Sequence, residues 1–213
     1  MKHFNDSSKK LYALCEKQAF FIKQANKDIG RCKKLVPILK KSRKSIYELY
    51  LKAESFDKRN SCLCDALLWL CDNFSFLEED FKFCVKKLSV QKGKLSQKGL
   101  PFCYEAATAY VILCECDFTE EAVMGIAAAC DKSIEKGLSD EDISGFPILL
   151  KSAVLYTLGN ACQRLLENGG YTESHDDGNI IINAIKSLKF LSVFSFDKAF
   201  ENCKLEKILK SDP

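Results

Sequence analysis

An apolar helical pattern around the only tryptophan is the strongest constraint on how this chain can fold. Four large side chains recur at the spacing of a single helix face: Leu67, Leu70, Phe74 and Leu77. A second stripe lies beside them and consists of Trp69, Asn73 and Phe76. A helix that is apolar over so much of its circumference is buried on more than one side. The pattern therefore predicts a central helix near residues 60–88 that other helices surround.

Long segments without helix breakers extend this prediction to the whole chain. Only 4 prolines and 10 glycines occur among 213 residues. We expect an all-α fold, an irregular bundle of about seven or eight helices. The expected helices cover residues 7–26, 31–54, 60–88, 101–116, 119–136, 139–167, 179–190 and 198–209. One helical domain, 1–213, is predicted, with two subdomains, 1–90 and 100–213, joined by a loop at 90–99, as the alternative.

Local signals mark where several of these helices begin. Pro101 is expected to open one helix and Thr119 to cap the next. Ser139 and Asp142 have the spacing of a capping box. Pro147 then marks either a kink in that helix or a restart after a first turn.

Positive charge is concentrated at the front of the chain. Residues 1–60 carry 16 Lys/Arg against 6 Asp/Glu, whereas the remainder carries 16 against 23. Seven cations without an intervening acid open the second expected helix: Arg31, Lys33, Lys34, Lys40, Lys41, Arg43 and Lys44. They predict either a surface for phosphates, anionic lipid or another polyanion, or simply a solvated helix face. Nucleic-acid binding is not expected, because no aromatic residues suited to base stacking are interleaved with these cations.

The 12 cysteines are expected to be free thiols on apolar helix faces, in a reducing cytosol. The first residues do not resemble a signal peptide, and no run of apolar residues is long enough to span a membrane. Cys62 with Cys64, and Cys114 with Cys116, are expected to lie within helices, which does not suit zinc. His175 is expected in a polar loop. The sequence therefore predicts no metal and no cofactor.

Acidic residues follow the tryptophan along the predicted central helix. Glu78, Glu79 and Asp80 are the only candidates for acid–base carboxylates, and they have no partner set that indicates catalysis. Asp72 and Asn73 are expected to be largely buried. They either bind backbone or another helix, or line a groove between subdomains.

Three segments, in order, resemble the cyclic β-1,2-glucan synthase family. Residues 66–79 read ALLWLCDNFSFLEE, residues 138–158 read LSDEDISGFPILLKSAVLYTL, and residues 183–213 begin NAIKSLKFLS and end KILKSDP. The resemblance makes Trp69, Asp72, Asn73 and Pro147 a structural signature. Ser144 stands where the family has tryptophan, and the chain stops at Pro213, where the family continues. We therefore expect a cloned fragment or a short stand-alone homologue.

The resemblance implies a non-catalytic helical module at the amino-terminal end of a UDP-glucose-dependent glucosyltransferase. Such a module would dock to the transferase or membrane-proximal parts, or help to retain glucan, at the cytoplasmic face of the inner membrane. Glucan retention predicts a groove lined by exposed aromatic residues, for which the candidates are Tyr104, Tyr110 and Phe146. The alternative is a stand-alone adaptor that binds a protein partner or an anionic surface, touching a membrane only peripherally.

Overall fold

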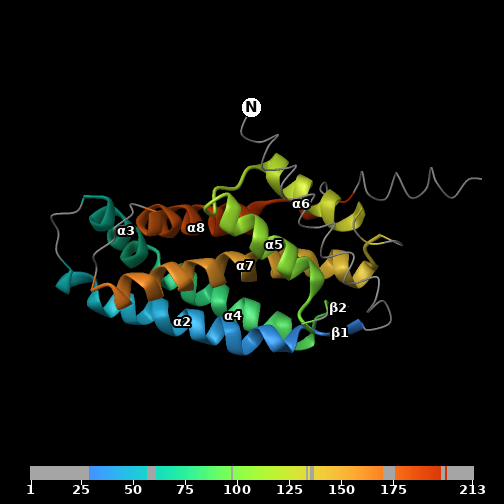
Figure 1. Ribbon diagram of the computed structural model, residues 1–213, viewed down its shortest axis with the longest axis horizontal. Helices are drawn as coiled ribbons and strands as arrows, with labels where there is room; N and C mark the ends of the chain where they lie inside the picture. The colour runs from blue at the N-terminus through green and yellow to red at the C-terminus, as the bar shows by residue number, and fades with distance from the viewer. Residues whose placement is uncertain are drawn as a thin grey trace, which may run out of the picture.

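The computed structural model describes residues 29–56, 61–96, 98–132, 134, 137–169, 176–197 and 200. Within these residues the chain is an all-α bundle, as predicted (Figure 1). The helix expected at 7–26 lies outside the described part, as do all residues of the one expected at 198–209 except Phe200.

Seven α-helices and one pair of short strands make up the described part of the chain. The helices are α2 (Leu35–Lys52), α3 (Ser61–Asp72), α4 (Phe74–Val90), α5 (Phe102–Leu113), α6 (Glu120–Lys132), α7 (Asp140–Glu167) and α8 (Asp176–Val193). Two short 3₁₀ helices flank α2: η1 (Cys32–Lys34) and η2 (Ala53–Ser55). The strands β1 (Ile29–Arg31) and β2 (Lys92–Lys94) pair antiparallel, although 90–99 was expected to be a loop.

The predicted central helix at 60–88 is wrong: the structure divides it into two helices and places a different helix at the centre. It is divided at Asn73, whose backbone leaves the helical region at φ −111° and ψ 9°. The Asn73 side chain donates a hydrogen bond of 2.7 Å to the carbonyl of Trp69, and asparagine competes with helical backbone bonding in this way. The apolar stripe continues across the break because α4 starts directly afterwards.

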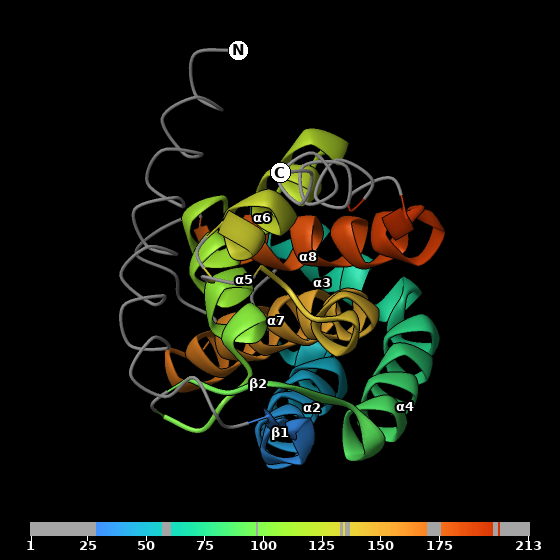
Figure 2. The same ribbon diagram turned by 90° about the vertical axis from the view of Figure 1, so that its right-hand side faces the viewer.

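The central element is α7, a 28-residue helix. Helices α2, α4, α5 and α8 all pack against it, and Figure 2 shows it end-on in their midst. Its middle is buried on every side, including Leu150, Ala153 and Leu158. One hydrophobic core joins elements before and after residues 90–99, since α2 packs on α7 and α3 packs on α8.

The start of α7 confirms the predicted capping box. The Ser139 hydroxyl accepts from the Asp142 backbone N–H, and Asp142 Oδ2 accepts from the backbone N–H and hydroxyl of Ser139. The other carboxylate oxygen accepts from the Lys94 backbone N–H at 2.8 Å, so the cap also holds strand β2. Pro147 lies inside α7, which continues through it; the helix does not restart there. Thr119 likewise caps α6 by accepting from Ala122 N–H.

Replacement of Ser139 by alanine is expected to lower the free energy of unfolding by about 1 kcal/mol. The variant removes the acceptor for Asp142 N–H and leaves one donor at the helix start without its partner. For a chain of this size the melting temperature should fall by about 2–4 °C in a calorimetric scan. Ser144→Ala is the control, because that exposed hydroxyl bonds only a carbonyl of the same helix. An equal effect in both variants would contradict the role of the cap.

A candidate ligand-binding groove

A groove lies between α2 and α5, with α7 as its floor. Figures 1 and 2 both show α7 between these two helices. The hollow has a volume of about 680 Å³, within the usual range for small-molecule sites. The lining residues that carry the argument are Lys41, Tyr104, Glu105, Tyr156, Asn160 and Gln163. The segment 98–100 closes one side of the hollow.

A glycine fixes how closely the floor and one wall approach each other. A Cβ atom built on Gly159 would lie 2.4 Å from the Ser42 Cβ and 2.6 Å from the Ser42 Cα. Only glycine allows α2 to pack this closely on α7. The depth of the groove therefore depends on the hydrogen-only side chain at residue 159.

Glu105 lines this groove, and one of its carboxylate oxygens is unsatisfied. Its side chain is 9% exposed, and its Oε1 lies 3.8 Å from Lys98 Nζ. Its Oε2 is buried and has no hydrogen-bond partner in the described part of the chain. Leaving a buried charged acceptor unsatisfied costs free energy, and a ligand that donates a hydrogen bond here would recover it.

Aromatic and amide side chains line the groove together with Glu105. The rings of Tyr104 and Tyr156 meet edge to face with centroids 6.5 Å apart. Burial raises the pKa of the Tyr104 phenol above its ordinary value. Gln163 accepts a hydrogen bond from Ser45 Oγ at 2.7 Å and donates one to Glu167, and Asn160 lies one turn before it. The groove thus combines ring surfaces with convergent donors and acceptors.

The expected glucan-binding aromatics are only partly where the prediction placed them. Tyr104 lines the groove but is 4% exposed, whereas Tyr110 and Phe146 are buried elsewhere in the core. Tyr110 stacks on Phe118, and Phe146 meets Phe200 at a right angle. None of the three candidates is an exposed aromatic, because the apolar face of each helix turns these rings inward.

The proposed signature residues lie away from the groove. Trp69 packs against the core from α3, and Lys186 and Lys189 of α8 lie 5.4 and 5.6 Å from its ring centre. Asn73 is buried and bonds backbone, as expected. The predicted burial of Asp72 is wrong: it ends α3 on the solvent side and is exposed.

The three neighbouring carboxylates do not form one site. Arg43 donates two hydrogen bonds to Glu78, at 2.8 and 2.5 Å, and these bonds lower the pKa of the Glu78 carboxyl. Glu79 is exposed. Asp80 points into the core, where its Oδ1 accepts a hydrogen bond of 2.8 Å from Lys151. They diverge because successive helical residues face different directions.

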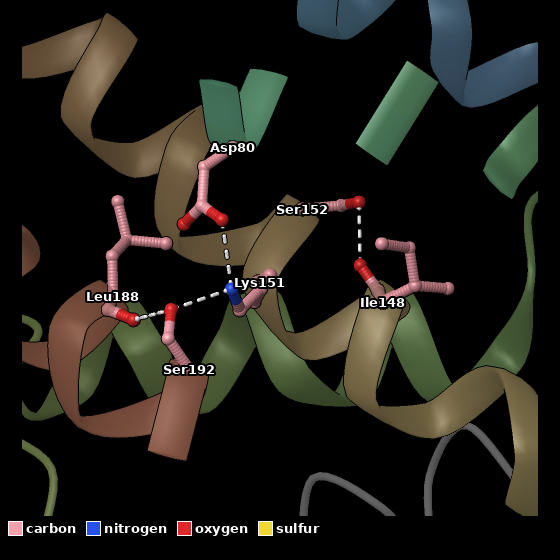
Figure 3. Close-up of polar contacts among 6 residues, drawn as sticks. All are labelled: Asp80, Ile148, Lys151, Ser152, Leu188 and Ser192. Carbon is pink, nitrogen blue, oxygen red and sulfur yellow. Dashed lines mark hydrogen bonds and ion pairs between the residues drawn. The ribbon is translucent and has the colours of Figure 1, made fainter. Parts of the chain in front are cut away.

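Lys151 of α7 links three helices in the core through hydrogen bonds. Besides Asp80 of α4, its Nζ donates to the Ser192 hydroxyl of α8 at 2.8 Å, and Ser192 in turn donates to the Leu188 carbonyl (Figure 3). Both charged side chains are 10% exposed. This arrangement is structural, since each charge has the other as its partner.

The seven predicted cations are all exposed, and two of them have carboxylate partners among the described residues. Arg43 is paired with Glu78, and Lys44 lies 3.6 Å from Glu48 on the same helix. Lys41 belongs to the groove wall.

Sequence reasoning did not single out Glu105, Tyr156, Asn160 or Gln163. The last three recur at helical spacing as polar groups along an apolar helix, which is the signal that could have indicated them.

The cysteines of the described residues are free, and most of them are buried. Burial raises the pKa of both Cys32 and Cys84 to about 12, so these thiols stay protonated at neutral pH. Cys71 is exposed, against expectation. Cys116 lies beyond the end of α5 at φ 62°, so the second C-x-C pair is not within a helix as expected.

The described residues contain neither a metal-binding cluster nor a membrane-spanning helix. No three His, Cys, Asp or Glu side chains gather there in a way that could hold a metal ion. None of the helices there is both long and apolar enough to cross a membrane. A scan against protein-family models, a search of curated proteins and a search of solved structures each found no match to this chain.

Proposed function

We propose that this chain is a non-catalytic helical module that holds a segment of glucan in the groove between α2, α5 and α7. The observation that carries the proposal is a groove lined by Tyr104, Tyr156 and Glu105, whose buried Oε2 has no hydrogen-bond partner among the described residues. Sugars present apolar C–H faces and many hydroxyl donors, and a groove for them needs ring surfaces together with carboxylate or amide acceptors.

The steps of recognition follow from the lining. A pyranose ring lies against Tyr156, and its hydroxyls donate to the Glu105 carboxylate. The Asn160 side chain supplies both a donor and an acceptor for a neighbouring hydroxyl. Polar side chains line part of the groove. The hydroxyls of a sugar can therefore form the hydrogen bonds that displaced water molecules would have made.

The resemblance to the cyclic β-1,2-glucan synthase family supports β-1,2-linked glucose as the ligand. In this proposal the module is part of, or works beside, a UDP-glucose-dependent glucosyltransferase. It keeps the growing product near the enzyme and itself carries out no transfer. Its protein partner is the remainder of that synthase.

Titration of the chain with linear β-1,2-glucan oligosaccharides should produce saturable shifts of amide signals in α5 and α7. Tyr156→Ala is expected to weaken binding about tenfold, which corresponds to about 1.4 kcal/mol of lost ring contact and desolvation. Tyr47→Ala is the matched control, because this exposed tyrosine lies on α2 outside the groove.

Three results would contradict the proposal. The first is the absence of shifts with any β-1,2-glucan. The second is equally tight binding of β-1,4-linked oligosaccharides, which would show that the groove is not specific for β-1,2-glucan. The third is equal weakening by the Tyr47 and Tyr156 variants, which would place the ligand outside the groove.

A further inference from the structure

Two cations face each other on the strand pair at one end of the bundle. In the β1–β2 register Arg31 is directly opposite Lys92, and both are exposed. Like charges at opposed positions of an antiparallel pair repel each other. The pairing of these residues therefore carries a cost that an anion bound between them would relieve.

More positive charge lies immediately beside this pair. Lys33 and Lys34 follow Arg31 in η1 and are exposed. Lys34 reaches across to the next segment of chain, since a Cβ atom on Gly99 would lie 2.5 Å from its Nζ. We call Arg31, Lys33, Lys34 and Lys92 the β1/β2 patch. Among the described residues no carboxylate forms an ion pair with any of the four.

Among the described residues, the first turn of α7 brings acidic residues next to β2. Asp142 is buried, and its two oxygens are taken up by Ser139 and by the Lys94 backbone. Asp140 and Glu141 are exposed, and the Glu141 carbonyl accepts a hydrogen bond from the Gln91 side chain. Negative charge thus adjoins one side of the patch and does not cover its cations.

Exposed apolar side chains accompany the cations. Ile29 is 54% exposed and lies on the same face of β1 as Arg31, two residues further on. Val90 is 73% exposed at the end of α4. The Cys32 backbone N–H donates to the Gln91 carbonyl at 2.9 Å, which places Val90 close to the cations of η1. Figure 1 shows β1 and β2 together at the end of the bundle opposite α3.

We infer that the β1/β2 patch docks this chain on an anionic lipid bilayer, with its cations on headgroup phosphates and Ile29 and Val90 in the interface. Cations next to exposed apolar side chains are typical of surfaces that bind at the lipid headgroup level. A soluble polyanion would use the cations but would gain nothing from exposed Ile29 and Val90. The inference is independent of the groove, which opens between α2 and α5.

Sedimentation of the full chain with phosphatidylcholine–phosphatidylglycerol vesicles tests the inference. The chain should bind these vesicles at low salt, bind less at physiological salt, and not bind pure phosphatidylcholine. The double variant Arg31→Gln/Lys92→Gln should reduce partitioning by more than tenfold, at about fivefold for each cation removed. The charge-matched control is Lys40→Gln/Lys44→Gln, which removes two exposed cations of α2 outside the patch.

Ile29→Ser/Val90→Ser is the second arm and keeps every charge. It should also reduce partitioning, while binding of inorganic polyphosphate stays unchanged. The inference is overturned if the α2 control weakens binding as much as the patch variant does. It is also overturned if polyphosphate binds as tightly as the vesicles and the apolar variant has no effect, because the patch would then be a site for soluble polyanions. All variants should retain the helical circular-dichroism spectrum of the parent chain.

Discussion

Replacement of Lys151 by methionine is expected to lower the free energy of unfolding by about 3–5 kcal/mol. Methionine keeps an unbranched side chain, one atom shorter than that of lysine, and has good helix propensity, so the main effect is the loss of the charge. The variant leaves Asp80 as a buried carboxylate without its cation, and Asp80 Oδ2 has no other described partner. A buried charge that loses its partner is strongly destabilising.

Urea denaturation measures this change. Lys86→Met is the matched control, because Lys86 is exposed on α4, and its free energy of unfolding should change by less than about 0.5 kcal/mol. The double variant Asp80→Leu/Lys151→Met should recover most of the loss, since replacing both partners of a buried pair by apolar groups is often neutral. Equal loss in the single and double variants would show that packing around α7, and not the ion pair, dominates.

Gly159→Val is expected to destabilise the fold by about 3 kcal/mol. The added Cβ would lie 2.6 Å from a backbone atom of α2, and a backbone atom cannot rotate away as a flexible side chain can. Helices α2 and α7 must therefore separate. The groove changes shape with them, so glucan binding should be lost together with stability.

Gly125→Val is the control for this experiment. A Cβ on Gly125 in α6 meets no atom within 4 Å. The variant also removes the unfavourable helix propensity of glycine. Its free energy of unfolding should stay within about 0.5 kcal/mol of the parent or rise slightly. If both glycine variants lose the same stability, close approach at Ser42 is not the cause.

Helical periodicity predicted the fold class and most helix starts, but not which helix is central. The stripe of Leu67, Leu70 and Leu77 is buried as expected. Periodicity cannot show that Asn73 ends one helix, because its side chain bonds to the Trp69 carbonyl only in a local geometry that competes with continued helix. The helix expected at 139–167 was not expected to be the central one, although the middle of α7 is buried on every side.

The candidate groove was the part least accessible to sequence reasoning. Tyr104 was among the expected aromatics, while Glu105 and Asn160 were not considered. Glu105 belongs to α5 and Asn160 to α7, and these two residues meet only because α5 packs on α7. The β1/β2 patch has the same origin, since Lys92 joins the cations of residues 31–34 through strand pairing.

The sequence by itself determined the local features of this protein: the helical class, the capping box of Ser139 and Asp142, and the concentration of cations near residues 31–44. These depend on neighbours within one or two turns, whose relative positions helix geometry dictates. Only the tertiary structure decided which charges find partners. Arg43 meets Glu78 and Lys151 meets Asp80 across helix contacts, whereas Glu105 Oε2 has no partner in the described part of the chain. Such pairings follow from how helices pack, and no spacing along the chain encodes them.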